Sequence, residues 1–444
     1  GFIPSPLSIY KKVFKLEPST ILEVDENLKV SKYKYYDLKK KLFKKSPYNK
    51  NVRADKDIID DANKILQSKI KNMLSKNFKV GCFLSGGIDS ALVTSVVQTM
   101  SKKKIETFTL KTSSKNFDES DNAKKISQYL GTRHNTYEVK KNDIINYVNN
   151  MHSYYSEPFG DSSQIPSFLL ARHAKKKIKI VLTGDGGDEI SGGYNRYLYF
   201  KQYHNLFNKN FFFKILLKLF IPILYNLNNI IKLDLFNIWN FNSKLRKIKS
   251  ITNVKNFSEY YDTSISQGES DDKYLKSSSF INNKKYIDKK KYTFKDLMYL
   301  DLKLYFPDDI LCKMDRASMH HSIENRTPFA NHKIIEHFFR LPTNLLINKF
   351  KTKVILKKLL RYYLPKKYIS NVKKGFSIPM SLYLKKYLST WGDNVLDVKN
   401  LSKHDLFNNE YLILKWTNFK KDKNDFNYHQ LWNILVLQNW INKN

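Results

Sequence analysis

The feature that most constrains the fold of this chain is a glycine pair between a short apolar run and a helical pattern. The run Val80–Leu84 predicts a strand, and apolar residues at helical spacing over Ser90–Met100 predict a helix that begins near Asp89 or Ser90. The pair Gly86–Gly87 allows backbone angles that side chains forbid. Unpaired N–H groups and the positive end of the helix dipole then point into one concavity, so the stretch predicts an anion cradle.

The polar residues of this stretch suit a phosphate group. Ser85 and Ser90 add hydroxyl donors, and Asp89 can hold a metal-bound water or cap the helix. The alternative is an ordinary turn with a glycine pair and an aspartate cap. The pattern Ser-Gly-Gly-x-Asp-Ser resembles the pyrophosphate-binding loop of adenylating ATP pyrophosphatases, and it lacks the Gly-Lys-Ser/Thr end of a Walker A loop. We therefore expect cleavage between the α- and β-phosphates rather than γ-phosphoryl transfer.

Strands alternate with helices through the first half of the chain. Further strands are expected at Ile105–Leu110, His134–Val139 and Ile178–Leu182, with helices at Asn51–Ser75, Asp118–Leu130, Asn142–Tyr155 and Gln164–Lys176. This alternation predicts an α/β fold with a doubly wound, mainly parallel sheet over about residues 75–195. Ligands of such sheets bind at the carboxyl ends of the strands, so other strand ends should also carry polar chemistry.

The stretch Thr183–Tyr194 meets that expectation, because it directly follows an apolar strand. It holds three carboxylates and five glycines in twelve residues, and such acid density suits Mg²⁺ held by oxygen ligands at a polyphosphate. The alternative is a solvated acidic turn. Phe117–Ser120, after another strand, is either part of the same site or only a helix cap with first-turn acids.

The pattern changes to helical segments from about residue 196, and residues 264–292 read as a mobile loop. Helices are expected at Asp296–Leu304, Ile310–His321, Lys333–Phe339, Lys353–Tyr363, Met380–Leu388 and Asn427–Trp440.

Two stretches of this half carry unusual charges. In the first, Lys313–Phe329, charged residues lie among Met, Ile and Phe, and they either form a buried ion network between helices or line a substrate site; they are Lys313, Asp315, Arg316, Glu324 and Arg326. His320 and His321 are not expected to bind a metal, because adjacent helical residues point apart and no third ligand lies near. The second stretch, Asn371–Pro379, presents two lysines in a turn.

Composition limits the class of protein. The chain of 444 residues is long enough for two or three domains, and its net charge of +37 is spread as short lysine runs, which favours compositional bias over a dedicated nucleic-acid surface. Cys82 and Cys312 are expected to be reduced thiols of a cytoplasmic enzyme. Charges and Pro222 interrupt the apolar stretch Phe211–Ile231, so a membrane span is not expected there, and no signal peptide is visible. The absence of an initial Met suggests a fragment or a processed chain.

Taken together, the motifs resemble the synthetase domain of glutamine-hydrolysing asparagine synthetases. The matching stretches follow that family's order and cover about residues 50–440: Ser85–Ser90, Phe117–Ser120, Glu157–Ser163, Thr183–Tyr194, Lys313–Phe329, Lys373–Pro379 and Leu431–Trp432. Residues 1–48 resemble the tail of the family's N-terminal glutaminase domain, whose body is missing upstream, and residues 49–444 would form the ATP-dependent domain with a helical part from about 196. The resemblance implies an adenine nucleotide α-hydrolase-like (PP-loop) fold.

The resemblance also implies a reaction and a set of roles. ATP would activate the aspartate β-carboxylate as β-aspartyl-AMP with release of pyrophosphate, and ammonia, drawn from glutamine in a full-length enzyme, would then displace AMP. Mg²⁺ and cationic donors would offset the repulsion between the two anions. The residues implied for ATP and pyrophosphate are Leu84, Ser85, Gly86, Gly87, Asp89, Ser90, Leu110, Thr183 and Gly184.

The remaining implied roles are catalytic, metal-binding and substrate-binding. Lys373 would stabilise charge at the α-phosphate, Asp188 would engage Mg²⁺ and pyrophosphate, and Asp185, where some members carry Glu, would position or deprotonate ammonia. Asp89, Asp188 and Asp315 are the candidate Mg²⁺ ligands. Asp161, Ser162, Glu324 and Arg326 are the candidate substrate residues.

Other functions stay open at this point. Within the family, the acceptor could be another carboxylate, such as a sugar acid of a surface polysaccharide, or the product could be a β-lactam ring. A tRNA-modifying PP-loop enzyme such as a lysidine synthetase is the alternative from another class, to which the net charge of +37 lends weight and against which Thr183–Tyr194 and Lys373–Pro379 argue. The expected partners are small molecules, without membrane or nucleic acid, and a homodimer is one arrangement left open.

Overall fold

The chain folds into two units that are described separately. The computed structural model describes residues 1–44, 55–114, 117–201, 220, 254, 256–266, 272–276, 286–287, 292–348, 351–369, 378–421 and 428–444. The first, here called the sheet unit, consists of Phe2–Asn195 and Met298–Met380, and the second, the helical unit, consists mainly of Arg196–Leu297 and Ser381–Asn444. The domain boundary expected between residues 48 and 49 remains a prediction.

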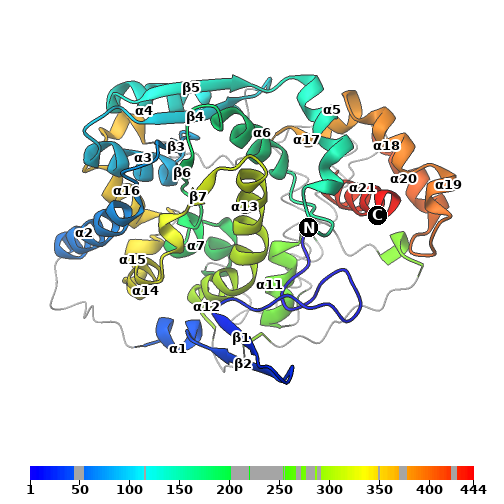
Figure 1. Cartoon of the computed structure of the whole chain (residues 1–444), viewed down its shortest axis with the longest axis horizontal. Coiled ribbons are helices and arrows are strands. Elements are labelled where there is room, and N and C mark those ends of the chain that lie inside the picture. The colour runs from blue at the N-terminus through cyan, green and yellow to red at the C-terminus, as the bar shows by residue number, and fades with distance from the viewer. Residues whose placement is uncertain are drawn as a thin grey trace. The chain divides into compact units, whose positions relative to one another are not determined.

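A five-stranded parallel sheet is the centre of the sheet unit (Figure 1). Its strands are β3 (Val80–Phe83), β4 (Glu106–Lys111), β5 (Arg133–Glu138), β6 (Ile180–Leu182) and β7 (Glu324–Arg326). They lie in the order β5-β4-β3-β6-β7, and every neighbouring pair runs parallel. The prediction of a parallel α/β sheet is therefore confirmed, whereas β7, a polar edge strand, was not expected.

The strand order reverses direction at β3. The chain builds outward from β3 through β4 to β5 and then returns to add β6 and β7 on the other side of β3. Cys82 of β3 pairs with Leu182 of β6, so these two strands end side by side. A reversal of this kind opens a crevice beyond the carboxyl ends of the two central strands, where doubly wound proteins bind their ligands.

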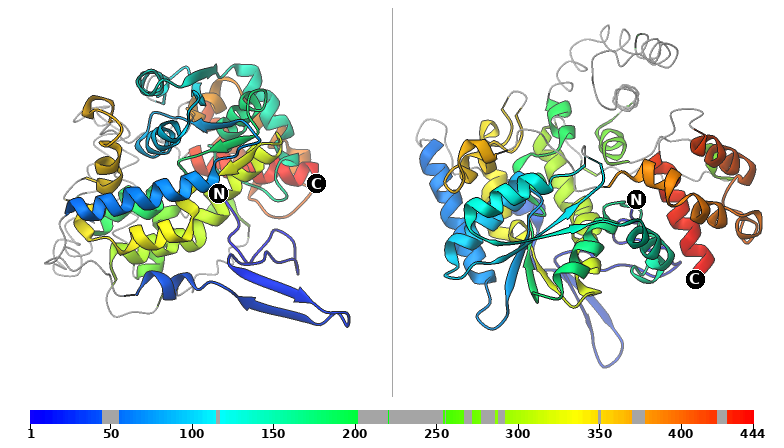
Figure 2. Two further views of the ribbon diagram at one scale, coloured as in Figure 1. Left: turned by 60° about the vertical axis from the view of Figure 1, so that its left-hand side comes forward. Right: turned by 90° about the horizontal axis from the view of Figure 1, so that it is seen from above.

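Helices lie on both faces of this sheet (Figure 2). One layer contains α2 (Asp55–Met73), α3 (Ile88–Met100), α4 (Ser120–Leu130) and α16 (Val354–Leu360), which contact one another through α3. The other contains α5 (Lys141–Asn150), α6 (Gln164–Ala174) and α13 (Cys312–Met319), which contact one another through α6. Right-handed crossovers place helices on opposite faces when the winding direction reverses. The doubly wound arrangement is confirmed.

The central elements are apolar because they are buried on every side. Cys82, Phe83 and all three residues of β6 are buried, and every residue from Ser90 to Val97 in α3 is buried as well. A helix that is covered all round carries no polar face, which explains why this stretch lacks charges after Asp89. The Ser85–Ser90 loop thus connects a buried strand to a buried helix, and both of its ends are held in place by packing.

One predicted helix break does not exist. Helices were expected at Asp296–Leu304 and Ile310–His321, but Asp301–Leu311 (η3) forms π-helix that runs directly into α13. Pro307 lies inside this segment. Because proline lacks an N–H and its ring crowds the preceding turn, a wider helical turn accommodates it where a regular α-helix would bend or end.

The N-terminal residues form a hairpin and an irregular segment. β1 (Thr20–Val24) pairs antiparallel with β2 (Val30–Lys34), and of their ten residues only Thr20 is buried. The short helix α1 (Leu38–Leu42) follows the hairpin.

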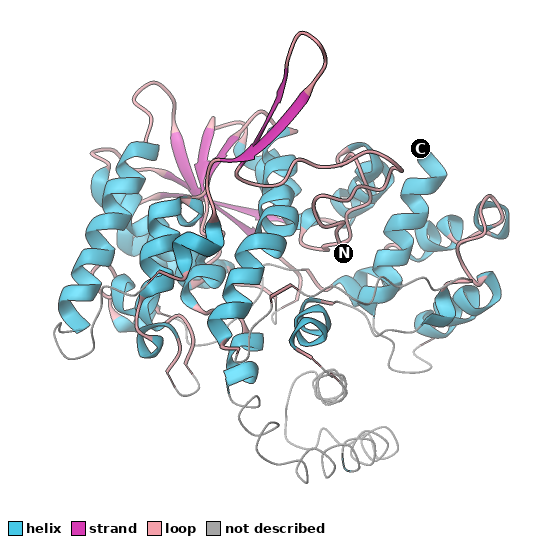
Figure 3. Ribbon diagram, turned by 90° about the horizontal axis from the view of Figure 1, so that it is seen from below, coloured by secondary structure: helices cyan, strands magenta, loops and turns pink. Residues whose placement is uncertain are grey.

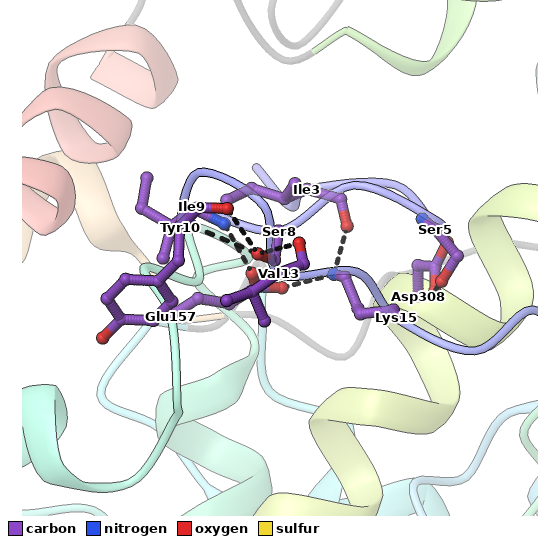
Figure 4. A network of polar contacts seen from close by, with 9 residues as sticks. All are labelled: Ile3, Ser5, Ser8, Ile9, Tyr10, Val13, Lys15, Glu157 and Asp308. Carbon is purple, nitrogen blue, oxygen red and sulfur yellow. Dashed lines mark hydrogen bonds and ion pairs between the residues drawn. The ribbon is translucent and has the colours of Figure 1, made fainter. Parts of the chain in front are cut away.

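The irregular segment before the hairpin is attached to the rest of the sheet unit by two carboxylates (Figure 4). Both the backbone N–H and the hydroxyl of Ser5 donate to Asp308, at 2.8 and 2.7 Å. Lys15 donates to Glu157 and to the Ile3 carbonyl.

The other elements are short helices. In the sheet unit they are η1 (Met151–Ser153), α7 (Gly187–Ser191), η4 (Pro328–Ala330), α14 (His332–Arg340), α15 (Thr343–Leu346) and η5 (Lys366–Tyr368), with α12 (Phe294–Leu300) and α17 (Met380–Lys386) at the unit boundaries. In the helical unit they are α11 (Phe257–Ile265), η2 (Asp272–Tyr274), α18 (Ser389–Val395), α19 (Val398–Leu401), α20 (Asn409–Lys420) and α21 (Tyr428–Lys443). Figure 3 distinguishes the helices, strands and loops of the described residues by colour.

The described part of the helical unit contains no strand longer than an isolated bridge, as its sequence pattern predicted. Among the described residues, no helix has both the length and the apolar character needed to cross a membrane. The apolar stretch Phe211–Ile231 lies outside the described residues apart from Phe220, and most of the expected loop at 264–292 lies outside them too.

Candidate functional site

The Ser85–Ser90 loop leaves the carboxyl end of β3 and is held by its own hydroxyl groups. The Ser85 and Ser90 hydroxyl oxygens lie 3.0 Å apart, and the Gly87 N–H donates to the Ser85 hydroxyl at 3.2 Å. Gly86 has a φ of +84°, a conformation that favours glycine. The loop therefore presents backbone N–H groups at the start of α3, the arrangement expected of an anion cradle.

The first turn of α4 packs against this loop, and a Cβ at Gly86 would lie 3.1 Å from the Glu119 carbonyl oxygen just before that helix. The Asn122 side chain donates to the Gly86 carbonyl at 2.7 Å, and a Cβ at position 86 would lie 3.0 Å from the Ala123 nitrogen. Asp118 accepts a hydrogen bond of 3.0 Å from the N–H of Ser120, the first residue of α4, whose N-cap is Glu119. The stretch Phe117–Ser120 thus leads into α4 beside the loop.

The acidic stretch after β6 packs against the same loop from the other side. A Cβ at Gly184 would lie 2.6 Å from the Ser90 nitrogen, and one at Gly187 would lie 2.5 Å from Cγ of Asp89. Only glycine fits at these two positions without displacing backbone or a carboxylate. The sequence-predicted residues of the two loops, from Ser85 to Ser90 and from Thr183 to Asp188, therefore form one cluster at the switch point.

A lysine that the sequence reasoning missed lies between the two loops. Lys353, at the start of α16, donates to Asp89 and lies 2.9 Å from the nearest oxygen of Asp188. Its side chain is only 9% exposed. Burial opposes the charge of this ammonium group, but the Asp188 and Asp89 carboxylates hold the pKa of Lys353 above its ordinary value.

Asp185 is half-buried in the acidic stretch, and one of its carboxylate oxygens is fully covered. Its Oδ2 atom is buried and has no hydrogen-bond partner among the described residues. Burial raises the pKa of this carboxyl group, while Lys313 and the Thr183 hydroxyl act in the opposite direction. Thr183 is itself buried, with its hydroxyl 3.2 Å from that of Thr327. Asp185 is thus a carboxyl group that holds a proton more readily than an exposed aspartate.

A buried ion pair supports this side of the site. Lys313 donates to Asp161 at 2.8 Å and to the Ser163 hydroxyl at 2.7 Å, and the Ser163 N–H donates to Asp161 at 2.9 Å. Burial opposes the charge on Asp161, but Lys313 and Ser163 lower its pKa well below the usual range. Asp309 faces the same pair, and its pKa is raised well above the usual range by burial and by Asp161.

Of the two alternatives for the five charged residues at 313–326, the buried ion network is wrong, and the substrate site stays a prediction. Only Lys313 is buried, and its partner Asp161 comes from the loop before α6. Asp315 and Arg316 form an exposed pair at 3.4 Å, because they lie on the outer side of α13. Glu324 and Arg326 pair with each other at 2.8 Å on the edge strand β7, and Arg326 also donates to the Met73 carbonyl.

The remaining predicted site residues are distributed as follows. Leu84 and Leu110 are buried at the carboxyl ends of β3 and β4, and Ser162 is buried beside Asp161. The candidate substrate residues Glu324 and Arg326 lie on β7 in the pair described above, and the candidate metal ligand Asp315 is exposed. Lys373 lies outside the described residues.

Two of the three candidate metal ligands lie together, and their chemistry fits Mg²⁺. Asp89 and Asp188 are bridged by a single ammonium group, so their carboxylates face the same small space. No cluster of three or more His, Cys, Asp or Glu side chains suited to a metal occurs within the described ranges. Mg²⁺ is commonly held by one or two carboxylates together with substrate phosphates, which is what this pair offers.

The adjacent histidines His320 and His321 pack against aromatic rings, and the two cysteines are unpaired thiols. The ring of His320 lies against Tyr154 and that of His321 against Phe168, with centroids 4.7 and 4.5 Å apart. Cys82 and Cys312 are free cysteines, as expected. Burial raises the pKa of Cys82 to about 12 and that of Cys312 to about 11, so neither is a reactive thiolate.

Comparisons with known proteins agree with this arrangement. A family model described as asparagine synthase matches residues 61–442. A putative asparagine synthetase 2 (glutamine-hydrolysing) of Methanocaldococcus jannaschii is 36% identical over 201 residues, which cover 45% of this chain and 37% of the relative. Asparagine synthetase 1 (glutamine-hydrolysing) of Bacillus subtilis is 24% identical over 445 residues, which cover 99% of this chain and 66% of the relative. The chain thus spans between about a third and two thirds of the length of these two relatives.

Among solved structures, an NH3-dependent NAD synthetase from Campylobacter jejuni is 17% identical, with a TM-score of 0.24 over 46% of this chain and 99% of that one. A U34-tRNA thiolase from Methanococcus maripaludis is 16% identical, with a TM-score of 0.25 over 35% of this chain and 55% of that one. These scores are too low to bear on function.

Proposed function

The chain belongs to the asparagine synthase family, and from this premise we propose that it activates the β-carboxylate of aspartate with ATP and transfers ammonia to it, which yields asparagine. Carboxylates are poor electrophiles, whereas an acyl-adenylate carries AMP as a good leaving group. A β-carboxylate oxygen bonds to the α-phosphorus as the bond between the α- and β-phosphates breaks and pyrophosphate departs. The ammonia nitrogen then bonds to the acyl carbon, AMP departs with the acyl oxygen it had gained, and the nitrogen loses a proton. The chain's family is one of ATP-using amidotransferase-like ligases. What we propose beyond the family is that aspartate is the acceptor.

The observation that carries the proposal is the shared position of the two strand-end loops. A loop rich in hydroxyl groups and glycine, two carboxylates and a buried lysine lie where β3 and β6 end side by side. Such a site can bind a polyphosphate and balance its charge, which is what adenylation of an anion demands. We propose that Ser85–Ser90 holds the pyrophosphate, and that Leu84, Leu110, Thr183 and Gly184 flank the nucleoside.

Cations complete the proposed site. Mg²⁺, held by Asp89 and Asp188, would supply charge neutralisation for the phosphates. Lys373 would stabilise the negative charge that develops on the α-phosphate, a role that suits a compact ammonium group. Asp185, with its raised pKa, would accept a hydrogen bond from the incoming ammonia and orient its lone pair.

The nitrogen source and the location form part of the same proposal. The relatives named above are glutamine-hydrolysing, so we propose that ammonia is made from glutamine by a glutaminase domain that precedes residue 49 in the full-length enzyme. Two free cysteines, one of them fully buried, favour a cytoplasmic site, where thiols stay reduced and ATP is available.

The proposal is tested by measuring AMP release over a panel of acids. Aspartate, glutamate, aminated dicarboxylic acids and uronic acids are each supplied with ATP, Mg²⁺ and ammonium, and parallel reactions add tRNA or replace ammonium with glutamine. We expect AMP only with aspartate and ammonium, and we expect glutamine to replace ammonium only in an enzyme that also carries the glutaminase domain. AMP formation with a uronic acid would move the assignment to another carboxylate, and AMP formation that requires tRNA would overturn it.

The residue roles are tested separately by ATP–pyrophosphate exchange. We expect Lys373→Ala and Asp188→Ala to reduce aspartate-dependent exchange by at least about a hundredfold, since each removes charge stabilisation of the transferring phosphate. Lys276→Ala and Asp405→Ala are matched controls, because these residues form an exposed pair in the helical unit. Full exchange in the first two variants, with circular dichroism spectra like the wild type, would contradict the roles assigned to them.

A further inference from the structure

The Lys353 side chain uses the same two carboxylates that a divalent cation needs. Asp89 stands in the first turn of α3 and Asp188 in the first turn of α7, and the Lys353 ammonium group bonds both. The three side chains come from separate elements, and α16 contacts both α3 and α7. The bridge is therefore fixed by the packing of the sheet unit rather than by one flexible loop.

The backbone around the bridge is shaped to hold it. Lys353 has a φ of +53°, in the left-handed region that lysine rarely adopts, and this turn begins α16. Gly193 lies against both Asp188 and the Lys353 side chain, so that a Cβ there would overlap them. An uncommon backbone angle and a close glycine contact at one ion pair indicate that the position of this ammonium group is specified by the fold.

An ammonium group and a divalent cation cannot occupy the space between these carboxylates together. Two positive centres between the same pair of oxygens would repel each other, and a metal ion needs the lone pairs that Lys353 now engages. Phosphate oxygens offer Lys353 another anionic partner, but only when a nucleotide is bound.

We propose that Lys353 is a placeholder cation, which occupies the Asp89–Asp188 site in the nucleotide-free protein and prevents it from binding a divalent cation before the nucleotide arrives. This inference deepens the proposed function, on which it rests, because it assigns the order in which metal and nucleotide bind. Lys353 is a positioning residue in this account. Its ammonium group leaves the two carboxylates only when a polyphosphate takes over its charge, so the metal enters together with the nucleotide.

The test is metal binding without nucleotide, with Mn²⁺ as the probe and free Mn²⁺ counted by electron paramagnetic resonance. We expect Lys353→Met to bind Mn²⁺ at least about fivefold more tightly than the wild type, the lower end of the usual range for coupled sites. Lys358→Met is the matched control, because Lys358 lies on the same helix but pairs with Asp55 at the surface. Adding Asp188→Asn to Lys353→Met should remove the gain.

A second measurement keeps the inference testable if Lys353→Met folds poorly. Lys353→Gln retains a polar side chain, and its melting temperature should rise more on addition of Mn²⁺ than that of the wild type. Equal or weaker Mn²⁺ binding in both Lys353 variants would overturn the placeholder role. Since no acid substrate is present in this titration, its failure is distinct from a failure of the AMP-release assay, which tests the reaction itself.

Discussion

At the scale of single residues, the buried pair of Lys313 and Asp161 has the largest expected effect on stability. Both side chains are about nine-tenths buried, and Ser163 completes their hydrogen bonding. Removing one partner of such a pair leaves a buried charge without compensation, which typically costs about 3–5 kcal/mol. We expect Lys313→Met to lower the free energy of unfolding by about that amount, measured by urea denaturation.

Two further variants control this prediction. Lys276→Met removes one partner of an exposed pair and should cost about 1 kcal/mol or less. Combining Lys313→Met with Asp161→Leu removes both charges and should recover part of the loss. A small effect of Lys313→Met alone would mean that water reaches Asp161 and compensates it.

A second residue-scale prediction concerns acid stability. His321 is buried against Phe168, and burial, with help from His320 and Lys175, lowers its pKa to about 4. The unfolded chain takes up a proton near pH 6.5 but the folded protein does so only near pH 4, so this group's stabilising contribution is lost as the pH falls through that window. We expect His321→Phe to lose less unfolding free energy than the wild type between pH 6.5 and 4, measured by urea denaturation at each pH. Parallel pH curves for the two proteins would show that His321 does not set this dependence.

Residues in ordered motifs could be predicted, and isolated ones could not. The loops at Ser85–Ser90 and Thr183–Asp188 were recognisable because several glycines and acids with one chemistry follow apolar strands. Lys353 had no such signal, since it is one of 78 basic residues and precedes an ordinary helical pattern. The partner of Lys313 was also hidden, because Asp161 lies 152 positions away and only the tertiary fold brings them together.

At the scale of elements, the attachment of the N-terminal segment is open to a direct test. Lys15 and the Ile9 N–H both donate to Glu157, and these contacts hold the loop that contains Lys11 and Lys12. Charge-assisted hydrogen bonds contribute about 1.5–3 kcal/mol each, so Glu157→Ala should increase local opening about tenfold or more. We expect trypsin to cleave after Lys11 or Lys12 correspondingly faster, as followed by mass spectrometry.

The control for this prediction is Glu23→Ala. Glu23 accepts a hydrogen bond from Tyr33 on the β1–β2 hairpin and makes no contact to the attached segment among the bonds described. Its cleavage pattern before residue 16 should match the wild type. Unchanged cleavage in Glu157→Ala would show that Ser5 and Asp308 suffice to hold the segment.

Element types were predicted better than their junctions. The strands β3 to β6 and their helices follow from apolar runs and helical periodicity, with bounds that differ by only a few residues. β7 was not predicted, because a polar edge strand of three residues carries no apolar run. The helix break expected between residues 304 and 310 was wrong, because a π-helical turn accommodates Pro307 without ending the helix. No local sequence pattern distinguishes such a turn from a helix end.

At the scale of the whole molecule, the net charge of +37 suggests a polyanionic partner, whereas the family membership indicates a ligase of small molecules. A basic excess attracts polyanions without regard to sequence, and such binding weakens steeply with salt. The family match over residues 61–442 names a family of ligases and does not explain the charge. That the basic excess reflects composition and not a nucleic-acid surface stays a prediction, which the reactions with added tRNA test.

The bridge between Asp89 and Lys353 joins positions that are 264 residues apart. A ribosome that adds about 5–20 residues per second needs between about 13 and about 50 seconds to travel from one codon to the other. Throughout that interval the emerging β3–α3 unit carries its acid without the cation that will later cover it. The nascent polypeptide thus completes this ion bridge only late in translation, after α16 has cleared the exit tunnel.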